Sequence, residues 1–249
     1  MLNKIIAVIY GVYTWTVFLL VVVTTTLLVA ITPGLGVRRA MARAAARLIF
    51  ASTGMPLRVT TIGQLPDSAC VIVSNHASFL DGVILTGALP PRFAFVIKNE
   101  MQNAPIAGLL LRRLGSEFVE RSDRHKGASD ARRIMRKAHE GEALVFFPEG
   151  TFRTDPGLGR FHSGAFAAAE RANLPVVPVV IKGSRHVLPA NRKLPRPGPI
   201  DVVITGPLDF DANHAEQSVS GVTEAARQRI LEHLEEPSLD IFIRPDRTE

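Results

Sequence analysis

A histidine and an aspartate lie five positions apart just after a short apolar segment of this 249-residue chain. His76 and Asp81 belong to the segment CVIVSNHASFLD, which passes from a buried-strand pattern into polar residues and then into the apolar pattern FLDGVIL. A histidine titrates near neutral pH and can act as a general base, and a carboxylate can hold the imidazole and stabilise its protonated form. The pair therefore has the residue types needed to activate a hydroxyl group for attack on a carbonyl.

The spacing of the pair sets a condition on the local structure. On one continuous helix, residues five apart differ by about 140° in direction, so His76 and Asp81 would point apart. They can meet where His76 lies in a turn and Asp81 in the first turn of the next helix. Ser78 as the N-cap gives that placement, because S-x-x-D resembles a capping box. The same pattern also allows a plain structural interpretation, in which Ser78 and Asp81 only begin a helix.

Alternating strand and helix patterns predict the fold that positions this pair. Short apolar segments indicate buried strands, and amphipathic segments between them indicate helices. We therefore expect an α/β domain with a largely parallel sheet flanked by helices, in which reactive groups lie at strand-to-helix junctions. Strands are predicted at residues 70–74, 93–97, 143–147, 176–181 and 200–205, and helices at 128–140, 164–172 and 222–235.

The N-terminal segment predicts attachment to a membrane. No charge lies between Ile5 and Val37, and residues 5–31 are almost wholly apolar. A helix over residues 5–31 would be about 40 Å long, which exceeds the roughly 30 Å hydrocarbon core. We expect one membrane-spanning helix or a re-entrant helix pair. A cleaved signal peptide is disfavoured, because the apolar stretch is too long and no A-x-A site follows closely.

A basic segment follows the apolar one. RRAMARAAARLIF, residues 38–50, carries four arginines and predicts a helix with a basic face and an apolar face. We expect the arginines to mark the cytoplasmic side of the membrane, with the helix packed on the domain, along anionic headgroups, or both. The chain then divides into a membrane anchor with a basic amphipathic helix, residues 1–50, and a second domain, residues 51–249.

The charge distribution narrows the class of partner. Of the net charge of +6, residues 1–50 carry +5, and residues 92–139 carry +6 from eleven basic and five acidic residues, so the rest of the chain is acidic. Two basic zones indicate an anionic lipid surface or a phosphate substrate. No nucleic acid is expected, because no nucleic-acid-binding motif is present and aromatic residues are few. No metal or cofactor is expected either, since Cys70 is the single cysteine and metal-ligand spacing is absent.

Four sequence blocks in a fixed order resemble the glycerophosphate and lysophosphatidate acyltransferase family. NHASFLD is similar to the family's NHxSxxD block, and FPEGTFR is similar to its FPEGT block. Together the blocks cover about residues 74–183, and four in order are far more specific than one. The blocks are NHASFLD (75–81), KNEMQNAPIAGLLLRRLGSEFVER (98–121), FPEGTFR (147–153) and LPVVPVVIKG (174–183).

The resemblance implies a reaction and a role for each matching residue. A fatty acyl group would move from acyl-CoA or acyl carrier protein, as co-substrate, to the free hydroxyl of 1-acyl-glycerol-3-phosphate, giving phosphatidic acid at the cytoplasmic face of the membrane. His76 would be the general base, Asp81 its partner, and Pro178 part of a wall near the acyl chain or active site. Residues implied in binding the acceptor are Arg121, Glu149, Gly150, Thr151 and Arg153.

The chemistry of these residues gives a separate argument for their roles in binding the acceptor. A guanidinium suits bidentate binding of phosphate, and glycine lets the backbone approach a ligand. Glu149 would repel a phosphate, so we expect it to orient Arg121 or Arg153, or to bind a substrate hydroxyl. We also expect backbone N–H groups near the His76 turn to stabilise the oxyanion.

Alternatives remain at this point. Phe152 stands between Thr151 and Arg153 where many family members have the arginine directly, and Glu120 stands where aspartate is frequent. The alternative acceptor is therefore another lysophospholipid or an amino-acid-containing lysolipid. A lipid hydrolase using Ser78 with His76 is a different class of enzyme, but no G-x-S-x-G motif is present. A non-enzymatic lipid-binding protein is the third class.

Overall fold

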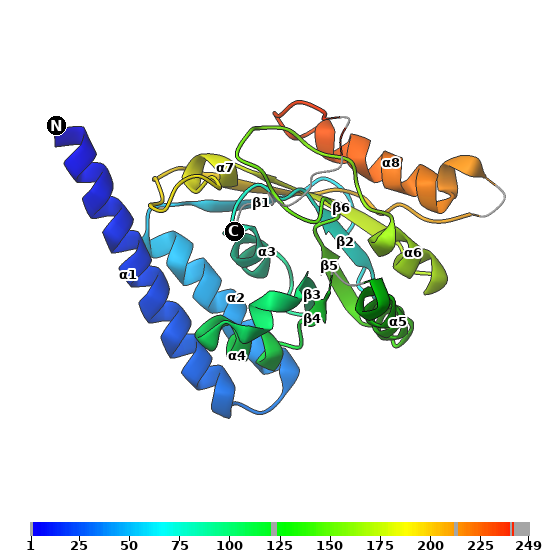
Figure 1. Cartoon of the computed structure of the whole chain (residues 1–249), viewed down its shortest axis with the longest axis horizontal. Helices are drawn as coiled ribbons and strands as arrows, with labels where there is room; N and C mark the ends of the chain where they lie inside the picture. Colours follow the sequence, from blue (N-terminus) through cyan, green and yellow to red (C-terminus); the bar gives the residue numbers. More distant parts are fainter. Residues whose placement is uncertain (1, 121–123, 212–213, 240, 242–249) are drawn as a thin grey trace.

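A seven-stranded sheet forms the centre of the computed structural model, which describes residues 2–120, 124–211, 214–239 and 241 (Figure 1). The strand order is β1-β7-β6-β2-β5-β3-β4, and neighbouring strands are parallel except for the pair β6 and β7. The strands are β1 (Leu57–Thr61), β2 (Val71–Ser74), β3 (Phe93–Lys98), β4 (Glu117–Val119), β5 (Ala143–Phe146), β6 (Val176–Lys182) and β7 (Ile200–Ile204).

Helices cover both faces of the sheet, which confirms the predicted α/β class (Figure 1). Alternate residues of β2 enter opposite layers: Ile72 packs with α2 and α3, and Val71 and Val73 pack with α6 and α8. The helices are α1 (Leu2–Ile31), α2 (Leu35–Ser52), α3 (Asp81–Ala88), α4 (Pro105–Arg113), α5 (Arg124–His139), α6 (Gly164–Arg171), α7 (Ser184–Val187) and α8 (Val219–Leu231), with short 3₁₀ segments η1 (Asn99–Asn103) and η2 (Ala215–Gln217).

The N-terminal apolar segment forms one uninterrupted helix, so the alternative of a re-entrant pair within residues 5–31 is wrong. Helix α1 has 30 residues and is long and apolar enough to cross a membrane by length and composition. It is, however, held along the side of the domain. Tyr10 and Tyr13 donate hydrogen bonds to carbonyls at the end of α2, and Trp15 donates to the Lys193 carbonyl. At its far end, Arg113 donates to the carbonyls of Val29 and Ala30.

The best-buried arginine of α2 forms its hydrogen bonds inside the protein and not at the predicted headgroup face. The side chain of Arg39 is only 9% exposed. Its guanidinium donates to the carbonyls of Leu114 and Arg92, at 3.0 and 2.7 Å, and pairs with Glu142 at 2.8 Å. The expectation of headgroup contact is therefore wrong for Arg39, because its donors are already used inside the fold. Arg47, by contrast, is exposed.

Candidate active site

The turn between β2 and α3 carries the predicted catalytic pair and is anchored to the neighbouring strand. The side chain of Asn75 donates to the Ile181 carbonyl at 2.9 Å and accepts from the Ile181 N–H at 2.8 Å. This amide therefore pairs with β6 as a backbone group would. It fixes the residue before His76, a role that the sequence pattern alone does not indicate.

His76 and Asp81 meet as the spacing required. His76 lies in the turn, and Asp81 is the first residue of α3. His76 Nδ1 is 2.8 Å from Asp81 Oδ2, and the same oxygen accepts the N–H groups of Ala77 at 2.6 Å and Ser78 at 2.9 Å. The aspartate side chain is 0% exposed and the histidine side chain 19%. A buried carboxylate thus holds a partly accessible imidazole.

Ser78 has a structural role. The predicted N-cap position is wrong, because α3 begins only at Asp81 and is preceded by Leu80. One half of the capping box is present, since the Asp81 carboxylate accepts the Ser78 N–H. The serine hydroxyl is buried, donates to the Leu188 carbonyl at 2.8 Å and accepts from the Leu80 N–H at 3.1 Å. A nucleophile needs an accessible hydroxyl next to its base, so this geometry argues against the hydrolase.

Glu149 lies behind His76, in the turn that follows β5. Its carboxylate accepts the backbone N–H of His76 at 2.8 Å and the backbone N–H of Gly159 at 3.0 Å. The residue is 1% exposed. Burial raises the pKa of Glu149 to about 7; the two backbone hydrogen bonds and the charge of Arg185 lower it, and the charge of Asp81 raises it. Its described contacts are thus with the backbone and not with Arg153, which suits a positioning role.

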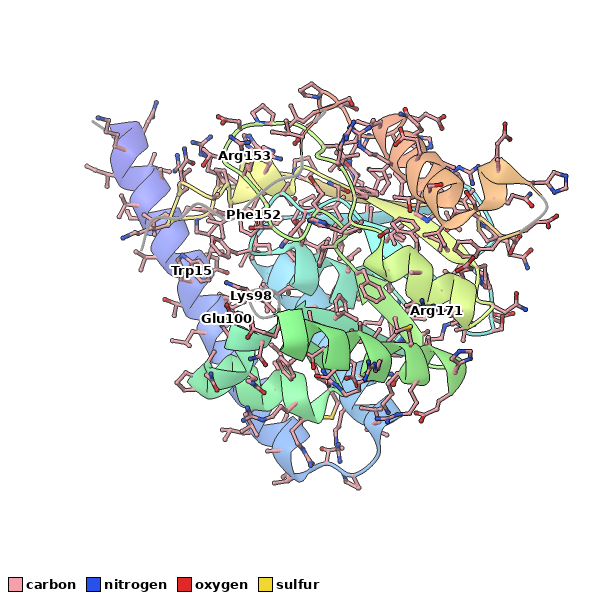
Figure 2. All side chains as sticks on the ribbon, turned by 45° about the vertical axis from the view of Figure 1, so that its right-hand side comes forward. Trp15, Lys98, Glu100, Phe152, Arg153 and Arg171 are labelled. Atoms are coloured by element: carbon pink, nitrogen blue, oxygen red, sulfur yellow. The ribbon has the colours of Figure 1, made fainter. Side chains whose placement is uncertain are left out.

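Aromatic rings enclose the imidazole. The ring of Phe147 stacks on His76, with centroids 4.3 Å apart and an interplanar angle of 21°, and Phe152 lies 4.6 Å away on an inclined plane. Phe79, which is exposed, packs edge-on against Phe152 at 4.8 Å. Phe152, which Figure 2 labels on the loop after β5, is the residue that departs from the family's FPEGT-R pattern. It gives the histidine an apolar edge suited to an acyl chain.

The remaining predicted residues lie on the same loop or outside the described part of the chain. Gly150 has a left-handed φ of 82° at the end of the turn, where its N–H donates to the Phe147 carbonyl. Thr151 is partly buried, and the exposed guanidinium of Arg153 is 3.8 Å from Asp155. Arg121 lies outside the described residues. The structure therefore joins His76, Asp81 and Glu149 and leaves substrate contact by the others as a prediction.

The backbone N–H groups of residues 76–78 do not form the expected oxyanion site. The N–H of His76 donates to Glu149, and those of Ala77 and Ser78 donate to Asp81. The expectation fails for these three groups because each is committed to a buried carboxylate. Their role is to fix the turn and to hold the carboxyl groups of Asp81 and Glu149 in place.

No group of three or more His, Cys, Asp or Glu side chains with a geometry able to hold a metal ion occurs in the part of the chain that the structure describes. The Cys70 thiol is buried, and burial raises its pKa to about 11. A hollow of about 390 Å³ between the end of α2 and β1 is lined by none of the candidate site residues.

Comparison with known proteins finds relatives among lipid acyltransferases. A 1-acyl-sn-glycerol-3-phosphate acyltransferase of Chlamydomonas reinhardtii is 33% identical over 189 residues, 74% of this chain and 55% of that protein. A lyso-ornithine lipid O-acyltransferase of Pseudomonas aeruginosa is 34% identical over 139 residues, 54% of this chain and 51% of that protein. The chain spans about half the length of the curated relatives it matches.

The fold has a counterpart among solved structures. The 1-acyl-sn-glycerophosphate acyltransferase of Thermotoga maritima superposes with a TM-score of 0.76 at 21% identity, covering 92% of this chain and 97% of that one. Residues 56–182, which include His76, Asp81 and Glu149, match the model of the Acyltransferase family. The chain therefore belongs to the acyltransferase family.

Proposed function

We propose that this protein transfers a fatty acyl group from a thioester to the free hydroxyl of 1-acyl-glycerol-3-phosphate, giving phosphatidic acid. The observation that carries the proposal is the contact of 2.8 Å between His76 and Asp81 at the end of β2, in a chain of the acyltransferase family. The names of several relatives point to this acceptor.

The geometry supports general-base catalysis by His76. Because Asp81 accepts from Nδ1, the other ring nitrogen, Nε2, is the one able to take the proton of the acceptor hydroxyl. The hydroxyl oxygen then attacks the thioester carbonyl, and the C–S bond breaks as the new ester bond is completed. His76 returns its proton to the departing thiolate. No covalent acyl-enzyme is needed, and Asp81 stabilises the transient imidazolium.

The acceptor phosphate is assigned to the loop after β5 and to Arg121. Arg153 is exposed on that loop, one residue from Phe152, which borders His76. A guanidinium there can bind phosphate in bidentate fashion. In this arrangement Glu149 holds the histidine backbone, and Gly150 and Thr151 supply the turn that brings the loop to the site.

The acyl donor is acyl-CoA or acyl carrier protein. Both are anionic, and residues 92–139 carry a net positive charge that favours either. No resident cofactor or metal takes part in the proposed chemistry.

We further infer that the enzyme works on the cytoplasmic face of a membrane. Helix α1 presents a row of exposed apolar side chains on the side away from its contacts with α2 and α4: Leu2, Ile5, Ile6, Ile9, Leu19, Leu20, Leu27 and Ile31 are among them. A helix held along the domain from Tyr10 to its last turn fits a position in the membrane surface, because its packed face stays with the domain while the other face enters lipid.

Two observations support an alternative to 1-acyl-glycerol-3-phosphate as the acceptor. The Pseudomonas aeruginosa relative is named for a lyso-ornithine lipid, and Phe152 separates Thr151 from Arg153. A shifted arginine would contact a different head group. An ornithine-containing lysolipid is therefore the alternative acceptor.

An acyl-transfer assay on the purified protein in detergent tests the proposal. Labelled acyl-CoA and acyl carrier protein are each offered with 1-acyl-glycerol-3-phosphate, other lysophospholipids and lyso-ornithine lipid. We expect phosphatidic acid as the main product and loss of at least about 1000-fold in kcat for His76→Ala, since the base and its partner act together. Activity equal to wild type in His76→Ala would sink the mechanism.

Ser78→Ala separates the transferase from the hydrolase. The transferase should keep most of its activity per folded molecule, because the hydroxyl that this change removes hydrogen-bonds only to Leu188 and Leu80 in the described contacts. A hydrolase with Ser78 as nucleophile would lose nearly all of it. Released fatty acid in place of acylated lipid would also favour the hydrolase.

A further inference from the structure

We propose that residues 236–239, here called the strap, together with Arg227 and Arg185, position His76 through the loop of residues 153–160. The proposal rests on the proposed function, for which His76 is the base. Strap, Arg227 and Arg185 all lie outside residues 56–182, the part matched by the family model. Figure 1 shows the loop after β5 running beside the chain that follows α8.

The strap pairs with the loop as a short parallel strand would. The N–H of Leu158 donates to the Pro237 carbonyl at 2.9 Å, and the N–H of Leu239 donates back to the Leu158 carbonyl at 2.9 Å. Leu158 and Ser238 form a parallel bridge. The loop passes so close that a Cβ at Gly157 would lie 2.6 Å from the Leu239 side chain. This contact fixes the loop backbone at its midpoint.

The buried guanidinium of Arg227, on α8, hydrogen-bonds to both the loop and the strap. Its guanidinium, 7% exposed, donates to the Gly159 carbonyl at 2.9 Å and to the Leu158 carbonyl at 3.2 Å. It also donates to Ser238 Oγ at 2.7 Å and to the Leu239 carbonyl at 3.0 Å. The planar fork of arginine can reach both chains at once, which a lysine cannot do.

Gly159 connects Arg227 to the catalytic histidine. Its carbonyl accepts from Arg227, and its N–H donates to Glu149 Oε2 at 3.0 Å. The other oxygen of Glu149 accepts the His76 N–H at 2.8 Å. Arg227, Gly159, Glu149 and His76 therefore form one continuous series of hydrogen bonds from α8 to the base.

A second clamp holds the front of the same loop. Arg185 of α7 pairs with both oxygens of Glu236, at 2.8 and 2.9 Å, and donates to the Arg153 carbonyl at 2.5 Å. Glu236 in turn accepts the Gly157 N–H at 2.7 Å. The loop segment between these points begins one residue after Phe152, whose ring packs on His76. The strap and the Arg185–Glu236 pair thus hold the loop that reaches the backbone of His76 through Gly159 and Glu149. The same loop carries Phe152, whose ring contacts the imidazole.

Arg227→Lys in the full-length protein tests the role of Arg227, with Arg229→Lys as the matched control. Arg229 lies on the same helix and donates to the Gly206 carbonyl at 3.3 Å, away from the loop. Both changes keep the charge. Hydrogen–deuterium exchange in detergent should become at least about threefold faster at residues 157–160 and at 74–78 in Arg227→Lys, and stay at the wild-type rate in Arg229→Lys.

The kinetic readout separates positioning from loss of folded protein. We expect kcat per folded molecule to fall about tenfold in Arg227→Lys with the acceptor KM within about twofold, because a displaced base slows chemistry more than binding. Ser238→Ala, which removes one acceptor of Arg227 and disturbs folding less, should change both readouts in the same direction by a smaller factor.

The pH profile gives an independent check. Burial raises the pKa of Glu149 to about 7, and the Gly159 N–H opposes this rise; the charged neighbours of Glu149 are Arg185 on α7 and Asp81 on α3. The ionised carboxylate of Glu149 is the stronger acceptor for the His76 N–H. A looser Gly159 contact, which raises the pKa of Glu149, should therefore move the rise of kcat with pH to higher pH in Arg227→Lys. A smaller folded fraction would lower kcat equally at every pH.

Two results would overturn the proposal: unchanged exchange at residues 74–78 in both Arg227→Lys and Ser238→Ala, or a kcat in Arg227→Lys equal to that of Arg229→Lys. If the wild-type protein acylates no lysolipid in the panel, the proposed function fails. The exchange comparison, which needs no activity, would still decide whether the strap holds the His76 turn.

Discussion

Asp81 concentrates its hydrogen bonds on one oxygen. Oδ2 meets His76 Nδ1 and two backbone N–H groups, whereas Oδ1 is buried and has no hydrogen-bond partner among the described residues. A carboxylate in this setting is well placed to stabilise positive charge on the imidazole, because its charged oxygen faces the ring directly. The uncharged amide of asparagine has the same shape, so it isolates the effect of the charge.

Asp81→Asn should therefore fold but lose most of its activity. We expect kcat to fall by on the order of 1000-fold, since the imidazolium loses its counter-charge. The amide NH₂ at the position of Oδ1 would lack an acceptor, which costs about 1–3 kcal/mol in the free energy of unfolding. Steady-state kinetics and denaturant unfolding of the same preparation measure both effects. Retention of more than about a tenth of wild-type kcat would contradict the assigned role of Asp81.

Glu149 makes stability depend on pH in a direction that can be worked out. Its pKa is about 7 in the folded protein against an ordinary value of 4.5, and burial is the main cause. Between these values the folded state binds the proton more tightly than the unfolded state does. The stabilising contribution is therefore fully present below pH 4.5 and is lost as the pH rises through about 7.

Glu149→Gln should remove this dependence. Relative to the variant, wild-type protein should lose up to about 3 kcal/mol in the free energy of unfolding between pH 4.5 and 7. Urea unfolding of both proteins across that range measures the difference. Glu235→Gln, at an exposed carboxylate paired with Lys182, serves as the control and should follow wild type. A constant difference between Glu149→Gln and wild type would show that Glu149 keeps an ordinary pKa.

At the scale of elements, Arg39 ties helix α2 to the segments that lead into the sheet. Arg39 reaches the carbonyls of Leu114 and Arg92 and the carboxylate of Glu142, three points on separate segments. A buried guanidinium in such a position joins α2 to three segments at once. Its removal leaves the carbonyls and the carboxylate without their donor.

Arg39→Ala should accordingly destabilise the protein by about 3–5 kcal/mol, the usual cost of breaking one side of a buried ion pair. Arg58→Ala provides the comparison, because Arg58 is exposed and lies 4.0 Å from Asp201; it should cost under about 1 kcal/mol. Denaturant unfolding measures both. The headgroup interpretation makes the opposite prediction, that Arg39→Ala weakens vesicle binding and leaves stability unchanged.

Apolar periodicity predicted those elements that are buried on both faces. All five predicted strands are present, whereas β1 and β4 were missed. Four of the five residues of β1 are exposed, and β4 has only three residues, so neither forms an apolar run. Both lie at sheet edges, where pairing with a neighbour defines the strand more than its own side chains do.

The site was predictable as far as its partners are close in sequence. His76 and Asp81 are five residues apart, and local helix geometry decides whether they meet. Glu149 lies 73 residues from His76, and Asn75 lies 106 residues from Ile181. Those contacts depend on the order of β2, β5 and β6 in the sheet, which the sequence pattern of one chain does not specify. A carboxylate held by backbone N–H groups also leaves no side-chain partner to find.

At the scale of the whole molecule, α1 is about 45 Å long, and its hydrogen bonds to the domain run from Tyr10 to its last turn, whereas residues 2–9 are exposed. Its first half contacts the end of α2 and Lys193, and its last turn is bound by Arg113. A helix that crossed the bilayer would carry one end away from the domain. We therefore expect α1 to lie along the membrane surface, with both of its ends on one side.

Labelling of single cysteines should show this topology. Lys4→Cys in the first turn of α1 and Val37→Cys in the first turn of α2, both at exposed positions, should react from the same face of sealed vesicles with a membrane-impermeant maleimide. Wild-type protein is the control, because its Cys70 is buried and burial raises the pKa of that thiol to about 11. Labelling from opposite faces would establish a membrane span and overturn the surface arrangement.

The close fit of α1 has a consequence for any attempt to prepare the enzyme without it. A Cβ at Gly11 would come within 2.7 Å of Leu194, and Trp15 and Phe18 pack against the same cluster as Phe50 and Ile84. A protein shortened to begin at α2 would expose that cluster to water and leave the Arg113 guanidinium without its carbonyl acceptors on α1. Deleting α1, the apolar N-terminal helix, would then give a fragment prone to self-association and not a soluble catalytic domain.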